Sequence, residues 1–195
     1  MKSDTVQSAM TTRDDFIRKP FPRSYRVVPG LLYAGAYPGD IDENIMETKI
    51  FSLLDCGICR VVNLMEASEI DHNGRYFLDY SEKLRELALK RVVEASVARF
   101  SIRDVSIPSQ SLMKKILDHI DRNITEGYPT YVHCWGGKGR TGTVVGCYLA
   151  RHGIAIGKDA LETIKHLRLH DASSHEPSPE TREQCDMVVS WKVGE

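Results

Sequence analysis

The feature that most constrains the fold is a short strand that leads into a glycine-rich loop and then into an apolar helix. Thr130–His133 combines β-branched and aromatic residues, as expected of a buried strand. Three glycines follow at positions 136, 137 and 139, and the apolar stretch 141–151 has the length of a helix. Strand–loop–helix units of this kind build open α/β sheets, which bind ligands at the carboxyl ends of their strands.

Predicted strands and predicted helices also alternate along the rest of the chain. Extended segments are predicted at 25–35, 60–65 and 100–102. Helices are predicted at 43–55, 81–95, 109–126, 157–170 and 179–192. This order predicts an α/β fold with a central, mostly parallel sheet that is flanked by helices.

Length and composition limit the organisation and the partners. A chain of 195 residues favours one domain, which we expect at 25–195 after an N-terminal extension of residues 1–24. The formal net charge of −1 gives no reason to expect a nucleic-acid or membrane partner, and the sequence contains no long apolar run. Five cysteines, an odd number, predict a reducing, cytoplasmic setting. The oligomeric state stays open, and a monomer is the simplest expectation.

The loop that follows the predicted strand, residues 134–140, has the composition of an anion site. We call it the cysteine loop. Its glycines allow successive backbone N–H groups to converge, and the following helix adds the partial positive charge of its N-terminus. Arg140 adds a planar fork of donors that matches two phosphate oxygens. The same surroundings stabilise a thiolate, so we expect Cys134 to be ionised and to attack a bound phosphoryl group.

Other phosphate-binding motifs fit this loop less well. The spacing Gly137-x-Gly139-x-x-Gly142 matches the dinucleotide fingerprint, which also needs an acidic residue about 20 positions later at the end of a strand. Asp159 and Glu162 stand near that distance but in a predicted helix. A Walker-type loop is excluded, because Lys138 is followed by Gly139 and not by Ser or Thr.

The run from His133 to Gly142 resembles the signature loop of the cysteine-dependent protein tyrosine and dual-specificity phosphatase superfamily. The opening segment from Val27 to Tyr33 is similar to the first strands of its compact atypical members. The resemblance implies that Cys134 is the nucleophile, that Thr141 eases departure of the thiolate, and that His133 shapes the loop. The phosphoryl group would be held by Trp135, Gly136, Gly137, Lys138, Gly139 and Arg140.

This resemblance also implies the reaction partners. The substrate would be a phosphorylated protein or a small phosphomonoester, and inorganic phosphate would be a product. Neither a metal nor a cofactor is required, because Arg140 and the loop amides neutralise the phosphoryl charge.

A leaving alkoxide or phenoxide needs a proton, so a carboxylic acid is expected on a neighbouring loop. Asp104, in a segment that resembles the acid loop of compact dual-specificity-like phosphatases, is the first choice, and Asp71 and Asp79 are alternatives. Near the C-terminus, Thr181-x-x-Gln184 resembles the element with which related phosphatases position the attacking water. A helix start capped by Ser178 explains the same residues equally well.

The substrate stays open between two classes. Lys138 resembles the lysine with which phosphoinositide and inositol-phosphate phosphatases meet extra phosphates, whereas Trp135 suits an aromatic phosphate such as phosphotyrosine. We expect a phosphatase of phosphoproteins, with an inositol-phosphate or phosphoinositide phosphatase as the second reading. A non-catalytic phosphate-binding module is the third. Whether Cys59 or Cys147 protects Cys134 on oxidation is not decided by the sequence.

Overall fold

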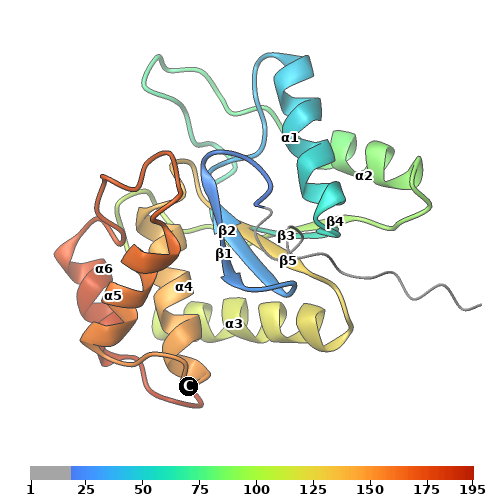
Figure 1. Ribbon diagram of the computed structural model, residues 1–195. Helices are drawn as coiled ribbons and strands as arrows, with labels where there is room; N and C mark the ends of the chain where they lie inside the picture. The colour runs from blue at the N-terminus through green and yellow to red at the C-terminus, as the bar shows by residue number, and fades with distance from the viewer. Residues whose placement is uncertain (1–18) are drawn as a thin grey trace, which may run out of the picture.

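Five strands form one sheet in the order β1-β2-β5-β3-β4, and helices cover both of its faces (Figure 1). The computed structural model describes residues 19–195. The strands are β1 (Ser24–Val28), β2 (Leu32–Gly35), β3 (Arg60–Asn63), β4 (Ser96–Arg99) and β5 (Thr130–His133). The helices are α1 (Glu43–Asp55), α2 (Ser81–Leu89), α3 (Gln110–Thr125), α4 (Gly139–Arg151), α5 (Lys158–Leu167) and α6 (Arg182–Ser190).

The strand order places β5 at the centre of the sheet. It pairs in parallel with β2 and with β3, and β4 extends the parallel part at one edge. Only β1, at the other edge, is antiparallel to its neighbour among these strands. The last residue of β5, His133, is in register with Gly35 and Asn63, so the three central strands end at one level. The predicted α/β class with a mostly parallel sheet is confirmed.

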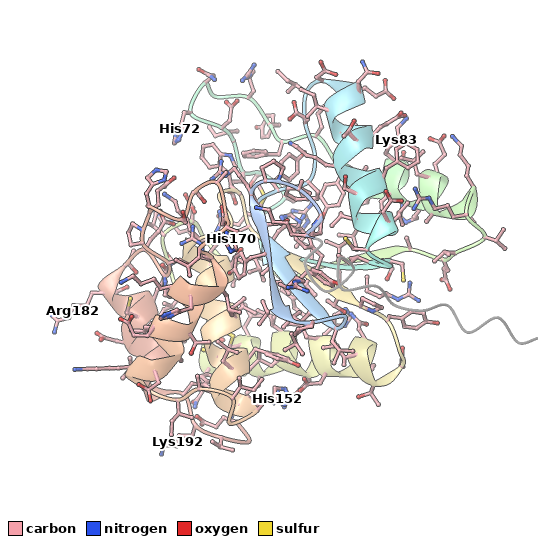
Figure 2. All side chains as sticks on the ribbon, viewed as in Figure 1. His72, Lys83, His152, His170, Arg182 and Lys192 are labelled. Carbon is pink, nitrogen blue, oxygen red and sulfur yellow. The ribbon has the colours of Figure 1, made fainter. Side chains whose placement is uncertain are left out.

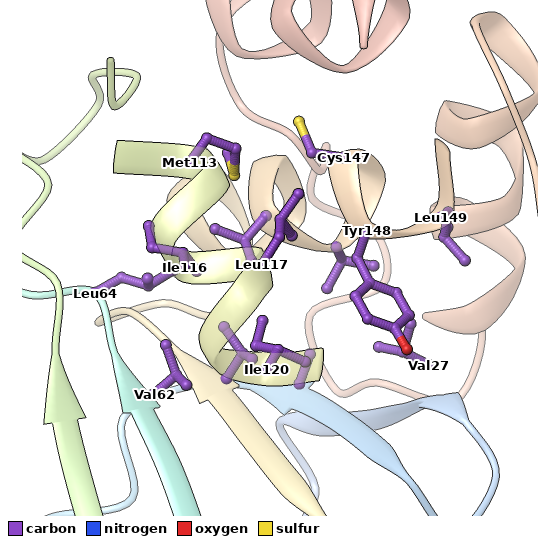
Figure 3. Close-up of a cluster of buried hydrophobic side chains, with 14 of the residues drawn as sticks. Val27, Val62, Leu64, Met113, Ile116, Leu117, Ile120, Cys147, Tyr148 and Leu149 are labelled. Carbon is purple, nitrogen blue, oxygen red and sulfur yellow. The ribbon is translucent and has the colours of Figure 1, made fainter. Parts of the chain in front are cut away.

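Alternation along the strands divides the core into two layers. Tyr131 of β5 faces the cluster formed with α1 and α2, whereas Val132 faces the cluster formed with α3, α4 and α5. Figure 3 shows the second layer, in which Val62 meets Ile116 and Ile120 of α3. Each fully buried side chain of this size contributes roughly 1.5–3 kcal/mol, so both layers hold β5 in place.

The largest differences from the predicted elements concern the second helix and the edge strand, and the helices predicted at 157–170 and 179–192 are shorter in the structure, at Lys158–Leu167 and Arg182–Ser190. The second helix ends at Leu89, because the chain turns through Val92, whose φ is +59°. The edge strand is Ser96–Arg99, whereas the sequence predicts it at 100–102. This strand carries no buried residue, so it lacks the apolar run that marks a central strand. The backbone amides of Phe100 and Ile102 still bond to the neighbouring strand segment, through the carbonyls of Asn63 and Leu64.

The start of the described chain packs on the domain. Phe21 is buried in the layer of α1 and α2, and the carbonyl of Pro22 accepts a hydrogen bond of 2.9 Å from the Ala172 amide. Residues 19–24 of the expected N-terminal extension therefore contact the predicted domain. The remainder of that extension, residues 1–18, lies outside the described residues.

The segment after α4 excludes the dinucleotide alternative. That alternative needs an acidic residue at the end of a strand. Asp159 and Glu162 instead lie within α5, as the helical pattern predicts.

Candidate active site

The cysteine loop leaves the carboxyl end of β5 and enters α4. Cys134 is its first residue, and the Cys134 side chain is buried. Four carbonyl groups of the loop before α4 accept hydrogen bonds from groups outside the loop. The donors are His133 Nδ1 to Cys134 (3.0 Å), the Tyr37 amide to Trp135 (3.0 Å), Arg23 Nη2 to Gly136 (3.0 Å) and Ser178 Oγ to Lys138 (2.8 Å).

The backbone N–H groups of the loop are left for an anion. Within residues 19–195, no N–H group from Trp135 to Lys138 donates a hydrogen bond to another protein group. The amides in the first turn of α4 also lack intrahelical acceptors, because the helix begins at Gly139. Because polar backbone groups are rarely left unpaired, this row of donors has the character that an oxyanion site needs.

Gly137 is required by this loop conformation. Its φ is +75°, a region that side chains other than glycine rarely adopt. A Cβ atom at this position would also lie 2.3 Å from the Gly35 carbonyl carbon and 2.4 Å from the Ala36 nitrogen. The turn is therefore tight against the end of β2.

His133 holds the loop from beneath. The side chain is fully buried, and burial lowers the pKa of His133 to about 3, so the ring is neutral at physiological pH. A carbonyl oxygen only accepts, so Nδ1 carries the proton that bonds to Cys134 O, and Nε2 accepts from Tyr80 Oη at 2.6 Å. The imidazole thus connects the Cys134 carbonyl to Tyr80, the residue that precedes α2.

Thr141 contacts the nucleophile directly. Its Oγ1 donates a hydrogen bond of 3.1 Å to Cys134 Sγ, and both side chains are buried. A hydroxyl at this place stabilises a thiolate by direct hydrogen bonding. The structure brings these two predicted residues together.

Arg140 is held by a carboxylate that the sequence reasoning missed. Its Nη1 and Nη2 bond to Glu69 Oε2 and Oε1 at 2.6 and 2.8 Å, and Nη1 also bonds to Ile102 O at 3.0 Å. Burial opposes the charge of this guanidinium, but the bonds to Glu69 raise its pKa above the usual value. Nε is buried and donates to no group among the described residues, so the guanidinium keeps a donor for a ligand.

One signal points to Glu69. The residue lies on the 66–80 loop, which follows β3, and β3 pairs with β5. Loops that leave adjacent parallel strands meet at the same sheet edge, so a carboxylate on this loop is placed to meet Arg140. No fixed spacing marks which carboxylate it is.

Asp104 reaches the same guanidinium from the acid loop, residues 103–108. Its Oδ1 lies 2.8 Å from Arg140 Nη2, while its side chain is 51% exposed. The alternatives are engaged elsewhere. Asp71 pairs with Arg75, whose backbone and side-chain hydrogen bonds lower the pKa of Asp71 to about 2. Asp79 accepts a hydrogen bond from the Ser81 amide at the start of α2.

Gln184 lies behind the acid loop and is fully buried. Its Nε2 donates to Ser106 O at 3.1 Å, and its Oε1 accepts from the Thr181 amide. The Gln184 amide in turn donates to Thr181 Oγ1, which completes a capping box. The cap of α6 is therefore Thr181, and the sequence assignment of this cap to Ser178 is wrong, because Ser178 bonds to Lys138 instead.

An apolar groove of about 820 Å³ includes Trp135, the residue that follows Cys134 in the chain, in its lining. Its walls include Phe21, Tyr37, Ile45 and Phe77. The indole packs against Phe77, with ring centroids 5.2 Å apart, and against His72, with ring centroids 4.4 Å apart. Figure 2 labels His72 on the 66–80 loop. The groove offers room for an apolar group beyond the phosphate site.

Residues 19–195 contain no group of three or more His, Cys, Asp or Glu side chains placed to hold a metal ion. Their helices are also too short or too polar to cross a bilayer. Cys59, Cys134, Cys147 and Cys185 are free thiols.

Known proteins share parts of this sequence. The chain is 29% identical over 139 residues to the phosphatidylglycerophosphate phosphatase PTPMT1 of Arabidopsis thaliana. The aligned region covers 71% of this chain and 35% of that protein. The chain is also 41% identical over 66 residues to the dual specificity protein phosphatase CDC14B of Mus musculus. This aligned region covers 34% of this chain and 12% of that protein. The chain therefore spans about a third of the first relative and much less of the second.

The fold is shared as well. The active form of Tk-PTP superposes with a TM-score of 0.64 at 26% identity, covering 86% of this chain and 95% of that one. Residues 40–154, more than half of the chain, match the family described as polymorphic toxin system, DSP-PTPase phosphatase. The match includes the cysteine loop, Glu69 and the acid loop. The chain belongs to this phosphatase family, within the cysteine-dependent tyrosine and dual-specificity phosphatases.

Proposed function

We propose that this protein hydrolyses phosphomonoesters on protein side chains through a cysteinyl-phosphate intermediate. One observation carries the proposal: Cys134 opens a loop whose backbone amides from Trp135 to Lys138 are unpaired among the described residues, and the Thr141 hydroxyl lies 3.1 Å from Cys134 Sγ. The phosphoryl oxygens fit the amides and Arg140 Nε, which brings phosphorus in line with the sulfur.

Two steps complete the reaction. In the first, the Cys134 thiolate attacks phosphorus, the bond to the leaving oxygen breaks, and Asp104 as a carboxylic acid gives that oxygen its proton. In the second, the Asp104 carboxylate takes a proton from water, the water oxygen attacks phosphorus, and the P–S bond breaks. Thr141 then donates its hydrogen bond to the released thiolate. The products are an alcohol or phenol and inorganic phosphate.

Gln184 is proposed as a positioning residue of the second step. Its hydrogen bond to Ser106 O supports this role, since Ser106 stands two residues after Asp104. Through this contact the glutamine fixes the acid loop. We also predict that Gln184 positions the attacking water.

The proposed substrate is a phosphorylated tyrosine, serine or threonine. The partly exposed Trp135 indole at the groove offers an apolar surface to the phosphorylated side chain and its neighbours. The mouse relative is named a dual specificity protein phosphatase. The free thiols of Cys59, Cys134, Cys147 and Cys185, the second of them the proposed nucleophile, support a reducing cytoplasm as the place of action.

A lipid phosphomonoester is the second candidate. The groove favours it, because an apolar groove lined by Trp135, the neighbour of Cys134 in the chain, suits acyl chains as well as side chains. The Arabidopsis relative is named a phosphatidylglycerophosphate phosphatase.

A substrate panel separates the candidates. We expect kcat/KM for phosphotyrosine and phosphothreonine peptides of equal sequence to exceed that for micellar phosphatidylglycerophosphate by at least about tenfold. The reverse order would favour the lipid. Turnover of none of them, by a chain that still binds inorganic phosphate, would leave a binding module. Cys134→Ser serves as the blank for every substrate.

A further inference from the structure

Lys138, the second cation of the cysteine loop, is held by two carboxylates. Its Nζ bonds to Glu176 Oε2 and lies 2.9 Å from Glu180 Oε1. The hydrogen bond to Glu176 raises the pKa of Lys138, and the same bond lowers the pKa of Glu176. The pair is thus ionised at neutral pH, and the three side chains together carry a net negative charge.

Both carboxylates stand on an anchored segment. The buried Arg168 guanidinium bonds to the Glu176 carbonyl at 2.9 Å and to the Ser173 carbonyl at 2.9 Å. The Glu180 amide donates to Gln184 Oε1 at 3.0 Å. The side chains of Lys138, Glu176 and Glu180 are 24%, 34% and 28% exposed, so none of them is a freely moving surface charge.

The anchoring extends to the loop itself. Ser178, between the two glutamates, donates to Lys138 O at 2.8 Å. A Cβ atom on Gly139 would lie 2.3 Å from Glu180 Oε2, so this carboxylate rests on the first residue of α4. The segment 173–180 therefore places fixed negative charge along the Lys138 side of the cysteine loop.

We propose that Glu176 and Glu180 are specificity-determining residues that keep Lys138 from binding a second phosphate group. The inference rests on the proposed phosphate site of the cysteine loop. A substrate with one isolated phosphate meets the amides and Arg140 and leaves the lysine paired. A substrate with another phosphate nearby meets two carboxylates first, and its binding has to break both ion pairs. The site thus selects against bisphosphorylated ligands such as inositol bisphosphates.

The test measures anion binding without turnover. Inorganic phosphate and pyrophosphate are titrated calorimetrically into Cys134→Ser, alone and combined with Glu176→Gln and Glu180→Gln. We expect the two glutamine changes to tighten pyrophosphate about tenfold and phosphate less than about threefold. Adding Lys138→Ala removes the gain for pyrophosphate.

A matched control removes two other carboxylates. Glu162→Gln with Glu183→Gln changes the net charge equally, on exposed positions of α5 and α6. We expect this pair to change the affinity ratio of the two anions less than twofold.

The outcomes separate this inference from the proposed function. The inference is overturned if Glu176→Gln with Glu180→Gln leaves the ratio of pyrophosphate to phosphate affinity unchanged. It is also overturned if the gain in pyrophosphate affinity persists when Lys138→Ala is added. Both results leave the phosphate site intact. A Cys134→Ser chain that is folded and binds neither anion overturns the phosphate site on which both proposals rest. Loss of turnover alone changes neither conclusion, because the experiment measures anion binding directly.

Discussion

Glu69 and Arg140 form two parallel hydrogen bonds of 2.6 and 2.8 Å on a guanidinium that is 1% exposed. The pair fixes the plane of the fork and leaves Nε unpaired among the described residues. We therefore interpret Glu69 as the residue that orients Arg140 toward the phosphoryl group.

Replacing Glu69 by Gln removes the charge and one acceptor of this pair. We predict that kcat/KM for an aryl phosphate falls about a hundredfold, because the guanidinium loses its fixed orientation. The free energy of unfolding falls by about 3 kcal/mol, as when one partner of a buried ion pair is lost. Glu66→Gln on the same loop is the control. Wild-type kcat/KM in Glu69→Gln would refute the orienting role.

Asp104→Asn tests the acid through the leaving group. We predict a loss of turnover by a factor of about 10²–10⁴ for an alkyl phosphate and a much smaller loss in the first step for a dinitrophenyl phosphate, which needs no proton. Asp71→Asn is the matched variant, since Asp71 was the competing candidate. Equal losses for both substrates, or a larger loss in Asp71→Asn, would assign the acid elsewhere.

Adjacent glycines of the cysteine loop give a paired test. In Gly137→Ala the new Cβ meets the backbone of Gly35 at 2.3 Å on a residue with φ +75°, so the loop has to change shape. We predict a loss of at least about 2 kcal/mol in unfolding free energy and of most phosphate affinity. A Cβ on Gly136 meets its nearest atoms only at 3.5 Å. Gly136→Ala should keep both properties, and equal damage in the two variants would contradict the described loop.

His133 makes the stability depend on pH. Burial lowers its pKa to about 3, whereas an unfolded histidine titrates near ~6.5. Between these values the unfolded chain binds more protons than the folded one. Stability therefore falls as the pH decreases from about 6.5 toward 3, by up to about 1.4 kcal/mol per unit.

The check is urea unfolding of wild type and His133→Gln at several pH values in this range. We expect the wild type to lose more stability than the variant on acidification. If the variant does not fold, the His133 ring is titrated by NMR in the wild type. A His133 pKa near the unfolded value would contradict the prediction.

The central part of the fold was predictable because its signals are local. The buried run of β5, the glycines of the loop and the apolar α4 follow one another in the chain, and their spacing alone places Cys134 beside Arg140 and Thr141. The edge strand β4 gave no such signal. Strand β4 carries charge and is not buried, so the sequence places the extended segment at the more apolar residues 100–102 that follow it.

The supporting residues of the site could not be predicted in the same way. Glu69, Glu176 and Glu180 lie outside helices and strands, in segments without periodicity. Their partners in the cysteine loop are 71, 38 and 42 positions away in the chain (140 − 69, 176 − 138 and 180 − 138). Such pairs depend on how loops pack at the sheet edge. The sequence therefore offered Lys138 as a free cation for extra phosphates, whereas the structure pairs it.

The most direct test of the account is detection of the intermediate on Cys134. Asp104→Asn is mixed with a dinitrophenyl phosphate, which transfers its phosphoryl group without an acid, while the loss of the base slows hydrolysis. After a rapid denaturing quench, mass spectrometry of peptides is expected to find one phosphoryl group on Cys134 and none in the same variant with Cys134→Ser. A phosphoryl group on another residue, or turnover that continues without Cys134, would contradict the mechanism.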